Sequence, residues 1–151
     1  MTEIAIRLYA ERDFDVVTSI WYRSWQSAHV PAKVTLEDLR ERWPWELANG
    51  WTVYVATLRG RIVGFLARRE DILEQLFIAP DSQRQGIGKQ LLDFAKAQMP
   101  GGFSLRTAVQ GQAGRFYERE GLHRGEVASH PKLDHQIVGY TWRPATAGPL
   151  P

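Results

Sequence analysis

A glycine-rich loop lies in the middle of the chain, between a predicted strand and a predicted helix. The strand covers residues 73–78, and the loop at residues 83–88 reads Gln-Arg-Gln-Gly-Ile-Gly. Behind it, apolar residues recur at the spacing of one helical face: Ile87, Leu91, Ala95 and Met99. Strand, loop and helix in this order predict a chain of the α/β class in which the loop opens a helix.

The start of that helix is a natural binding site for a phosphate group. The first backbone N–H groups of a helix have no partner within it, and the helix dipole places positive charge at the same end. Gly86 and Gly88 allow close approach of a phosphate because neither carries a Cβ. Arg84 and Lys89 add charge beside them. The alternative is an ordinary turn at the start of a helix, because two glycines at this spacing are a weak signal.

The rest of the chain alternates between strands and helices. Strands are predicted at residues 4–8, 51–58, 61–68, 103–109 and 136–143, and helices at residues 11–25, 35–49 and 112–120. Thr35 is the predicted N-cap of the second helix, and Pro44 predicts a kink or a division within it. The last strand is expected to be exposed, which allows a homodimer through sheet pairing.

Length and composition fit one compact domain. The chain has 151 residues, near the usual domain size of about 100–150 residues. We expect one domain at residues 1–143 and a mobile tail at residues 144–151, where prolines, alanines and glycine follow no period. No apolar run approaches the roughly 20 residues that cross a bilayer, and the N-terminus lacks the layout of a secretory signal. A cytoplasmic protein without membrane contact is therefore expected.

Charge and cysteine usage exclude several classes of function. The chain contains no cysteine, so we expect no thiolate nucleophile and no thiolate metal site. The four histidines show no metal-ligand spacing, and we expect no metal. The net charge is +2 with basic and acidic residues interspersed, which argues against a nucleic-acid partner.

Two motifs resemble those of the Gcn5-related N-acetyltransferases, the GNAT family. Residues 76–92 look like its central motif, whose signature is Gln or Arg, two residues, Gly, one residue, and Gly or Ala. Residues 110–122 are similar to its second motif, in which Ala, Phe-Tyr-Glu and Gly-Phe recur at this spacing. The resemblance covers residues 51–122 and departs from the pattern at Gln110 and Leu122, where the family often has Asn and Phe.

The resemblance implies a fold and an acetyl donor. The fold is of the GNAT-type α/β (α+β) class, a mixed, mostly antiparallel central sheet that is splayed open and flanked by helices on both faces. The donor is acetyl-CoA, whose pantetheine arm pairs with the strand before the loop and whose pyrophosphate rests on the loop amides. The implied cofactor-binding residues are Leu76, Phe77, Ile78, Gln83, Arg84, Gln85, Gly86, Ile87, Gly88, Lys89, Gln110, Arg115 and Tyr117.

Two side chains are the candidate catalytic residues. The resemblance places the Tyr117 hydroxyl near the thioester sulfur, where a positioned phenol can donate to the departing thiolate. The alternative for Tyr117 is a core aromatic residue. Glu74 is the candidate base, acting directly or through a water, since some family members use a glutamate in a comparable place; the alternative is a solvated carboxylate at a strand edge.

The aromatic segment near the N-terminus is the candidate acceptor side. In the family, the first helices and their connection cover the acceptor groove. Trp25 and His29 are four residues apart and can share one helical face, so both are candidate substrate-binding residues. The alternative is core packing, because large aromatic side chains bury well at many positions.

These patterns together predict an acetyl-CoA-dependent N-acetyltransferase. A primary amine would attack the thioester directly in a ternary complex, since the chain has no cysteine for a covalent intermediate. The sequence leaves open whether the acceptor is a small-molecule amine or an amine of a peptide or protein. The alternative function is a non-catalytic acyl-CoA-binding sensor or interaction module.

Overall fold

The computed structural model describes residues 3–27, 33–109, 113–131 and 136–144. Within these residues the strands form one seven-stranded sheet in the order β1-β2-β3-β4-β5-β7-β6. The strands are β1 (Ala5–Leu8), β2 (Thr52–Leu58), β3 (Arg61–Arg69), β4 (Ile72–Ile78), β5 (Phe103–Ala108), β6 (His123–Ser129) and β7 (Gln136–Trp142). Every neighbouring pair is antiparallel except β4 with β5, which confirms the expected mixed, mostly antiparallel sheet.

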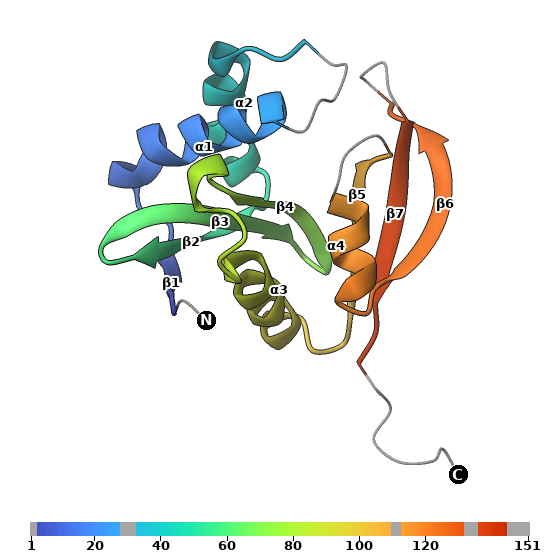
Figure 1. Ribbon diagram of the computed structural model, residues 1–151. Coiled ribbons are helices and arrows are strands. Elements are labelled where there is room, and N and C mark those ends of the chain that lie inside the picture. The colour runs from blue at the N-terminus through green and yellow to red at the C-terminus, as the bar shows by residue number, and fades with distance from the viewer. Residues whose placement is uncertain (1–2, 28–32, 110–112, 132–135, 145–151) are drawn as a thin grey trace.

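Helices cover both faces of this sheet (Figure 1). They are α1 (Phe14–Ser27), α2 (Leu36–Ala48), α3 (Ile87–Gln98) and α4 (Ala113–Arg119), with short 3-10 turns at η1 (Glu11–Asp13) and η2 (Pro80–Ser82). In Figure 1, α1 and α2 lie on one side of the strands β2 to β4, and α3 lies on the other. Each side has its own buried apolar cluster, so the sheet is packed on both faces.

The helix α2 begins as its sequence predicts. Thr35 is its N-cap: the Thr35 hydroxyl accepts from the Asp38 amide at 3.1 Å, and the Asp38 carboxylate accepts from the Thr35 amide at 3.0 Å. These reciprocal bonds satisfy two backbone donors at the helix start. Pro44 lies inside α2 and does not divide it, since one helix runs from Leu36 to Ala48.

The C-terminal part of the sheet differs from the sequence prediction. The strand β7 pairs with β5 on one side and β6 on the other, so the last strand is not an exposed edge. The edge is β6, a strand that the sequence analysis missed. All seven of its residues are exposed, which explains the absence of an alternating apolar pattern. Pairing of the last strand with a second copy, as expected above, is therefore not available.

The sheet opens between β4 and β5. These parallel strands share a single register pair, Ile72 with Ser104, and the Ser104 amide donates to the Asp71 carbonyl at 3.1 Å. The register between β3 and β4 also shifts, and the shift leaves Glu74 without a partner on β3. Beyond Ile72, β4 pairs only with β3 among the described residues, which agrees with the splayed sheet that the resemblance implies.

Candidate functional site

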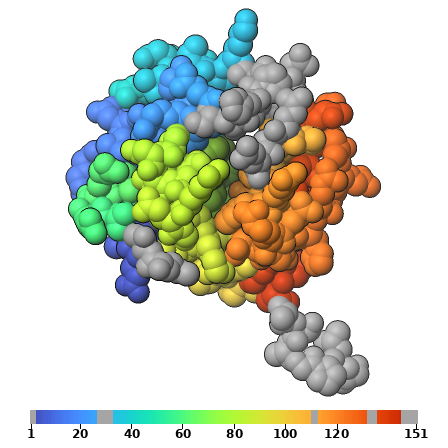
Figure 2. Space-filling view, in the orientation of Figure 1, coloured from blue at the N-terminus to red at the C-terminus, as the bar shows by residue number. Residues whose placement is uncertain are grey.

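A cavity of about 550 Å³ lies beside the end of β4 that does not pair with β5. Its walls come from β4, the loop that follows, the first turn of α3, α4 and one residue of α1. Figure 2 shows the yellow-green surface of the loop and α3 directly beside the orange surface of α4. The lining residues are Ser24, Leu76, Phe77, Ile78, Ser82, Gln83, Arg84, Gly86, Ile87, Gly88, Lys89, Ala113, Phe116, Tyr117, Arg119 and Glu120.

The β4 wall offers main-chain groups. Leu76, Phe77 and Ile78 line the cavity as predicted. The Ile78 carbonyl points away from β3, because it accepts long hydrogen bonds from the Ser24 hydroxyl at 3.5 Å and the Gln83 side-chain amide at 3.4 Å. An unpaired strand edge of this kind is able to bind an extended ligand as an added strand.

The loop wall offers backbone donors. Arg84 and Gly86 both have positive φ, 66° and 79°, and Gly86 is the N-cap of α3. The Gln90 amide donates to the Gly86 carbonyl at 3.2 Å. The amides of residues 87–89 precede this bond, so they have no acceptor within the helix. The loop therefore presents the free N–H groups and positive dipole end that the sequence predicts.

Gly88, in the first turn of α3, lies against Phe116 of α4. A Cβ added at Gly88 would lie 3.4 Å from Cζ of Phe116, an ordinary contact distance, and the Phe116 ring lines the same cavity. This contact joins the two motifs that carry the family resemblance.

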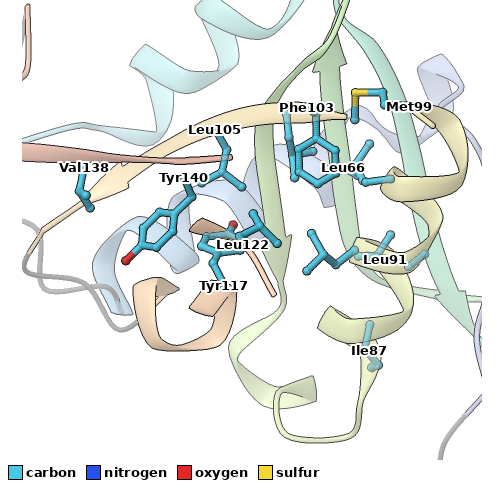
Figure 3. Close-up of a cluster of buried hydrophobic side chains, with 14 of the residues drawn as sticks. Leu66, Ile87, Leu91, Met99, Phe103, Leu105, Tyr117, Leu122, Val138 and Tyr140 are labelled. Carbon is cyan, nitrogen blue, oxygen red and sulfur yellow. The ribbon is translucent and has the colours of Figure 1, made fainter. Parts of the chain in front are cut away.

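Tyr117 lies in the apolar interior at the edge of the cavity. Its ring is 6% exposed and belongs to the cluster of buried side chains drawn in Figure 3. Burial raises the pKa of the Tyr117 hydroxyl well above its ordinary range. The hydroxyl therefore stays protonated at neutral pH and acts as a hydrogen-bond donor or acceptor. Tyr117 is at once a core aromatic residue and a residue of the cavity wall.

Lys89 is held by two carboxylates. Its Nζ atom lies 3.1 Å from Glu120 Oε1 and 3.6 Å from Asp93 Oδ2. The pKa of Lys89 is raised, chiefly by the hydrogen bond with Glu120. Sequence reasoning missed Glu120 and Arg119 as cavity residues. Glu120 comes three residues after Tyr117, and Arg119 comes three residues after Phe116. This spacing was the available signal, because residues three apart lie on the same face of a helix.

Three of the predicted catalytic and cofactor-binding residues lie outside the cavity wall. Glu74 pairs with Arg69, whose Nη1 lies 3.3 Å from Glu74 Oε1. Gln85 and Arg115 are exposed, and neither is among the lining residues. The cation that α4 contributes to the cavity is Arg119, one turn after Arg115.

Of the two predicted acceptor residues the structure describes Trp25, which does not line the cavity. Trp25 is partly buried and packs against the apolar cluster beneath α1 and α2, which agrees with the alternative of core packing. His29 and Gln110 lie outside the described residues. Ser24, on the same helix as Trp25, is the α1 residue that lines the cavity.

Comparisons with known proteins agree with this geometry. Residues 49–122 match the model of the acetyltransferase (GNAT) domain, and they contain β4, the loop, α3 and α4. Over these residues the chain matches the GNAT family. The uncharacterized N-acetyltransferase YafP of Escherichia coli is 28% identical over 130 residues, which are 81% of this chain and 83% of YafP.

Solved structures share the fold of this chain. YjaB of Escherichia coli, solved in its apo form, has a TM-score of 0.73 at 24% identity and covers 95% of this chain and 100% of its own. The protein yncA of Salmonella typhimurium, solved with its cofactor acetyl-CoA, has a TM-score of 0.70 at 14% identity and covers 99% of both chains. The GNAT fold expected from the sequence is thus confirmed.

The described residues contain neither a membrane-spanning helix nor a cluster of metal ligands. No helix in the ranges given above is long and apolar enough to cross a membrane. Likewise, no group of three or more histidine or acidic side chains in the described part of the chain is placed to hold a metal ion.

Proposed function

We propose that this protein is an acetyl-CoA-dependent N-acetyltransferase that acts on a primary amine. The observation that carries the proposal is the cavity between the unpaired end of β4 and the start of α3, with Tyr117 in its wall. One side of this cavity offers strand-edge groups, the other offers free helix amides, and a phenol lies within the same cavity. The match to the GNAT family supports the same activity.

The cavity offers hydrogen-bonding partners to two parts of an acyl-CoA, the pantetheine arm and the pyrophosphate. The extended pantetheine arm carries amides that can pair with the open edge of β4 at Leu76 and Ile78. The pyrophosphate can accept from the amides that open α3, where the dipole favours negative charge. The fold neighbour yncA was solved with acetyl-CoA, which supports the choice of donor.

Direct transfer needs one bond made and one broken. The neutral amine attacks the thioester carbonyl, so a C–N bond forms, the C–S bond breaks, and the nitrogen releases a proton to water or a base. We propose that a backbone amide near Phe77 or Ile78 stabilises the oxyanion. The departing thiolate finally takes its proton from solvent, since the parent thiol has a pKa of about 8.5.

Tyr117 acts on the leaving sulfur by hydrogen bonding. Burial raises its pKa, so complete loss of its proton to the thiolate would be uphill. A hydrogen bond that is stronger to the thiolate than to the thioester still lowers the barrier, because it stabilises the charge that develops in the transition state.

Glu74 as the base stays a prediction. Its carboxylate is paired with Arg69 and lies outside the cavity wall, so the role requires a water between Glu74 and the amine. The variant Glu74→Gln tests it. Loss of the acidic limb of the pH–rate profile would support the role, whereas an unchanged profile would exclude it.

Calorimetry and an amine screen test the proposed function together. We expect acetyl-CoA to bind, and at least one class of amine to release thiol faster than hydrolysis does. Polyamines, amino sugars, amino acids and lysine peptides should be included, which separates small-molecule from peptide acceptors. Acetyl-CoA binding without turnover on any amine would favour the sensor, and no binding would refute both functions.

A further inference from the structure

An ion pair crosses the cavity wall from α3 to Glu120, the residue that follows α4. Lys89 Nζ lies 3.1 Å from Glu120 Oε1, and both residues line the cavity. The Glu120 side chain is 16% exposed and that of Lys89 is 49% exposed. The lysine next to the phosphate-binding amides is therefore already occupied by a carboxylate.

The backbone at Glu120 is fixed independently of this ion pair. Lys96 Nζ donates to the Glu120 carbonyl at 3.0 Å, and the Glu120 amide donates to the Phe116 carbonyl at 3.0 Å. Removal of the Glu120 charge therefore leaves the end of α4 held to α3. The contact that the Glu120 carboxylate makes is the ion pair with Lys89 in the cavity wall.

A carboxylate in this place opposes an anionic ligand. A pyrophosphate at the start of α3 must either draw Lys89 away from Glu120 or bind beside the intact ion pair. In both cases Glu120 lies within the distance over which charges act in physiological salt, about 8 Å, if the ligand contacts Lys89. The uncharged pantetheine arm, by contrast, lies along β4 and has no charge for Glu120 to repel.

We propose that Glu120 is a specificity-determining residue, which lowers the affinity of the cavity for the pyrophosphate-bearing donor by holding Lys89. The inference rests on the proposed function, because it assumes that CoA binds here. As a consequence, the affinity for the donor depends less on contacts to its nucleotide end and more on contacts between its pantetheine arm and β4.

The test compares CoA with pantetheine, which lacks the nucleotide and its phosphates. Calorimetry measures CoA and NMR titration measures pantetheine, each on the wild type, Glu120→Gln and Glu118→Gln. Glu118 is the matched control, since it is an exposed glutamate two residues earlier, in the last turn of α4, and does not line the cavity. We expect Glu120→Gln to bind CoA about fivefold more tightly, the upper range for one exposed ion pair. Pantetheine binding, and both ligands on Glu118→Gln, should be unchanged.

The variants Lys89→Gln and Lys89→Gln/Glu120→Gln complete the test. If Glu120 acts by holding Lys89, its replacement should improve CoA binding less in the Lys89→Gln background. The inference is overturned if Glu120→Gln binds CoA no more tightly, if pantetheine gains equally, or if the gain persists fully without Lys89. Failure of the wild type to bind CoA would instead refute the proposed function.

Discussion

Tyr117 packs against Tyr140, with the ring centroids 5.7 Å apart and the ring planes inclined by 44°. Both rings are buried, at 6% and 2% exposure, and Figure 3 shows them side by side in one cluster. Only Tyr117 of the two lines the cavity. Removing the hydroxyl from each tyrosine in turn therefore compares a residue that lines the cavity with a buried neighbour that does not.

We expect Tyr117→Phe to lower turnover about a hundredfold, because the hydrogen bond to the departing sulfur is lost. The dissociation constant for CoA should stay nearly the same, since the pyrophosphate and pantetheine contacts are to main chain. Steady-state kinetics and calorimetry measure the two effects. Tyr140→Phe should keep turnover within about twofold. Equal losses in the two variants would mean that the effect comes from packing.

Gly86 and Gly60 give a second matched pair. Their φ angles are 79° and 80°, so alanine should cost each site about 1 kcal/mol of unfolding free energy. Only Gly86 lies in the phosphate loop, and a Cβ at Gly60 would meet nothing within 4 Å. Urea unfolding should show similar losses, whereas CoA affinity should fall about tenfold for Gly86→Ala alone. Normal CoA binding by Gly86→Ala would contradict the loop site.

The buried carboxylate of Glu46 depends on Arg69. Glu46 is 4% exposed, and its oxygens accept from Arg69 at 2.6 Å and from Arg42 at 2.8 Å. Arg69→Met leaves Glu46 with one partner, and we expect a loss of about 2 kcal/mol in unfolding free energy. Arg68→Met is the control, because within the described residues the Arg68 side chain donates to the exposed Gln98 carbonyl at 3.1 Å, and its loss should cost less than about 1 kcal/mol. A loss in Arg69→Met no larger than in the control would contradict this account.

Stability should fall in acid through Asp13. The pKa of Asp13 is lowered, chiefly by the hydrogen bond from Arg7, so the folded state binds this proton more weakly than the unfolded chain. The stabilisation is complete above the unfolded pKa of about 4 and is lost as the pH falls through the lowered folded value.

We expect the unfolding free energy to fall less steeply in Asp13→Asn than in the wild type when the pH is lowered from about 6 to about 2. At neutral pH this variant should lose about 2 kcal/mol. Asp15→Asn is the control, since its side chain is 81% exposed beside Arg40. If the unfolding free energy of Asp13→Asn fell with pH as steeply as that of the wild type, Asp13 would not be responsible for the loss of stability in acid.

Much of the fold was predictable because its signals are local. The hairpin turn needed residues that tolerate positive φ, and Arg59 and Gly60 adopt it at 53° and 80°. Thr35 as an N-cap marked the start of α2, and the structure adds its reciprocal bonds with Asp38. The strand β6 was not predictable in this way, because its exposed side chains carry no pattern and its order comes from hydrogen bonds to β7.

The site was predictable where it uses main chain and less so where it uses side chains. The motif pointed to the glycine loop and the end of β4, and most of these residues line the cavity, whereas Gln85 does not. Spacing did not show that Glu74 turns to Arg69, since the register shift in β4 decides this direction. Nor did it show the link of Lys89 to Glu120, which requires α3 and α4 to lie together.

The single register pair between β4 and β5 has a wider consequence for the tolerance of this fold to mutation. Past that pair the edge of β4 is open, and the groups along it are peptide N–H and C=O groups that every residue type except proline supplies in full. Substitutions along this edge can therefore change the side chains of the cavity wall without removing its backbone hydrogen-bonding groups.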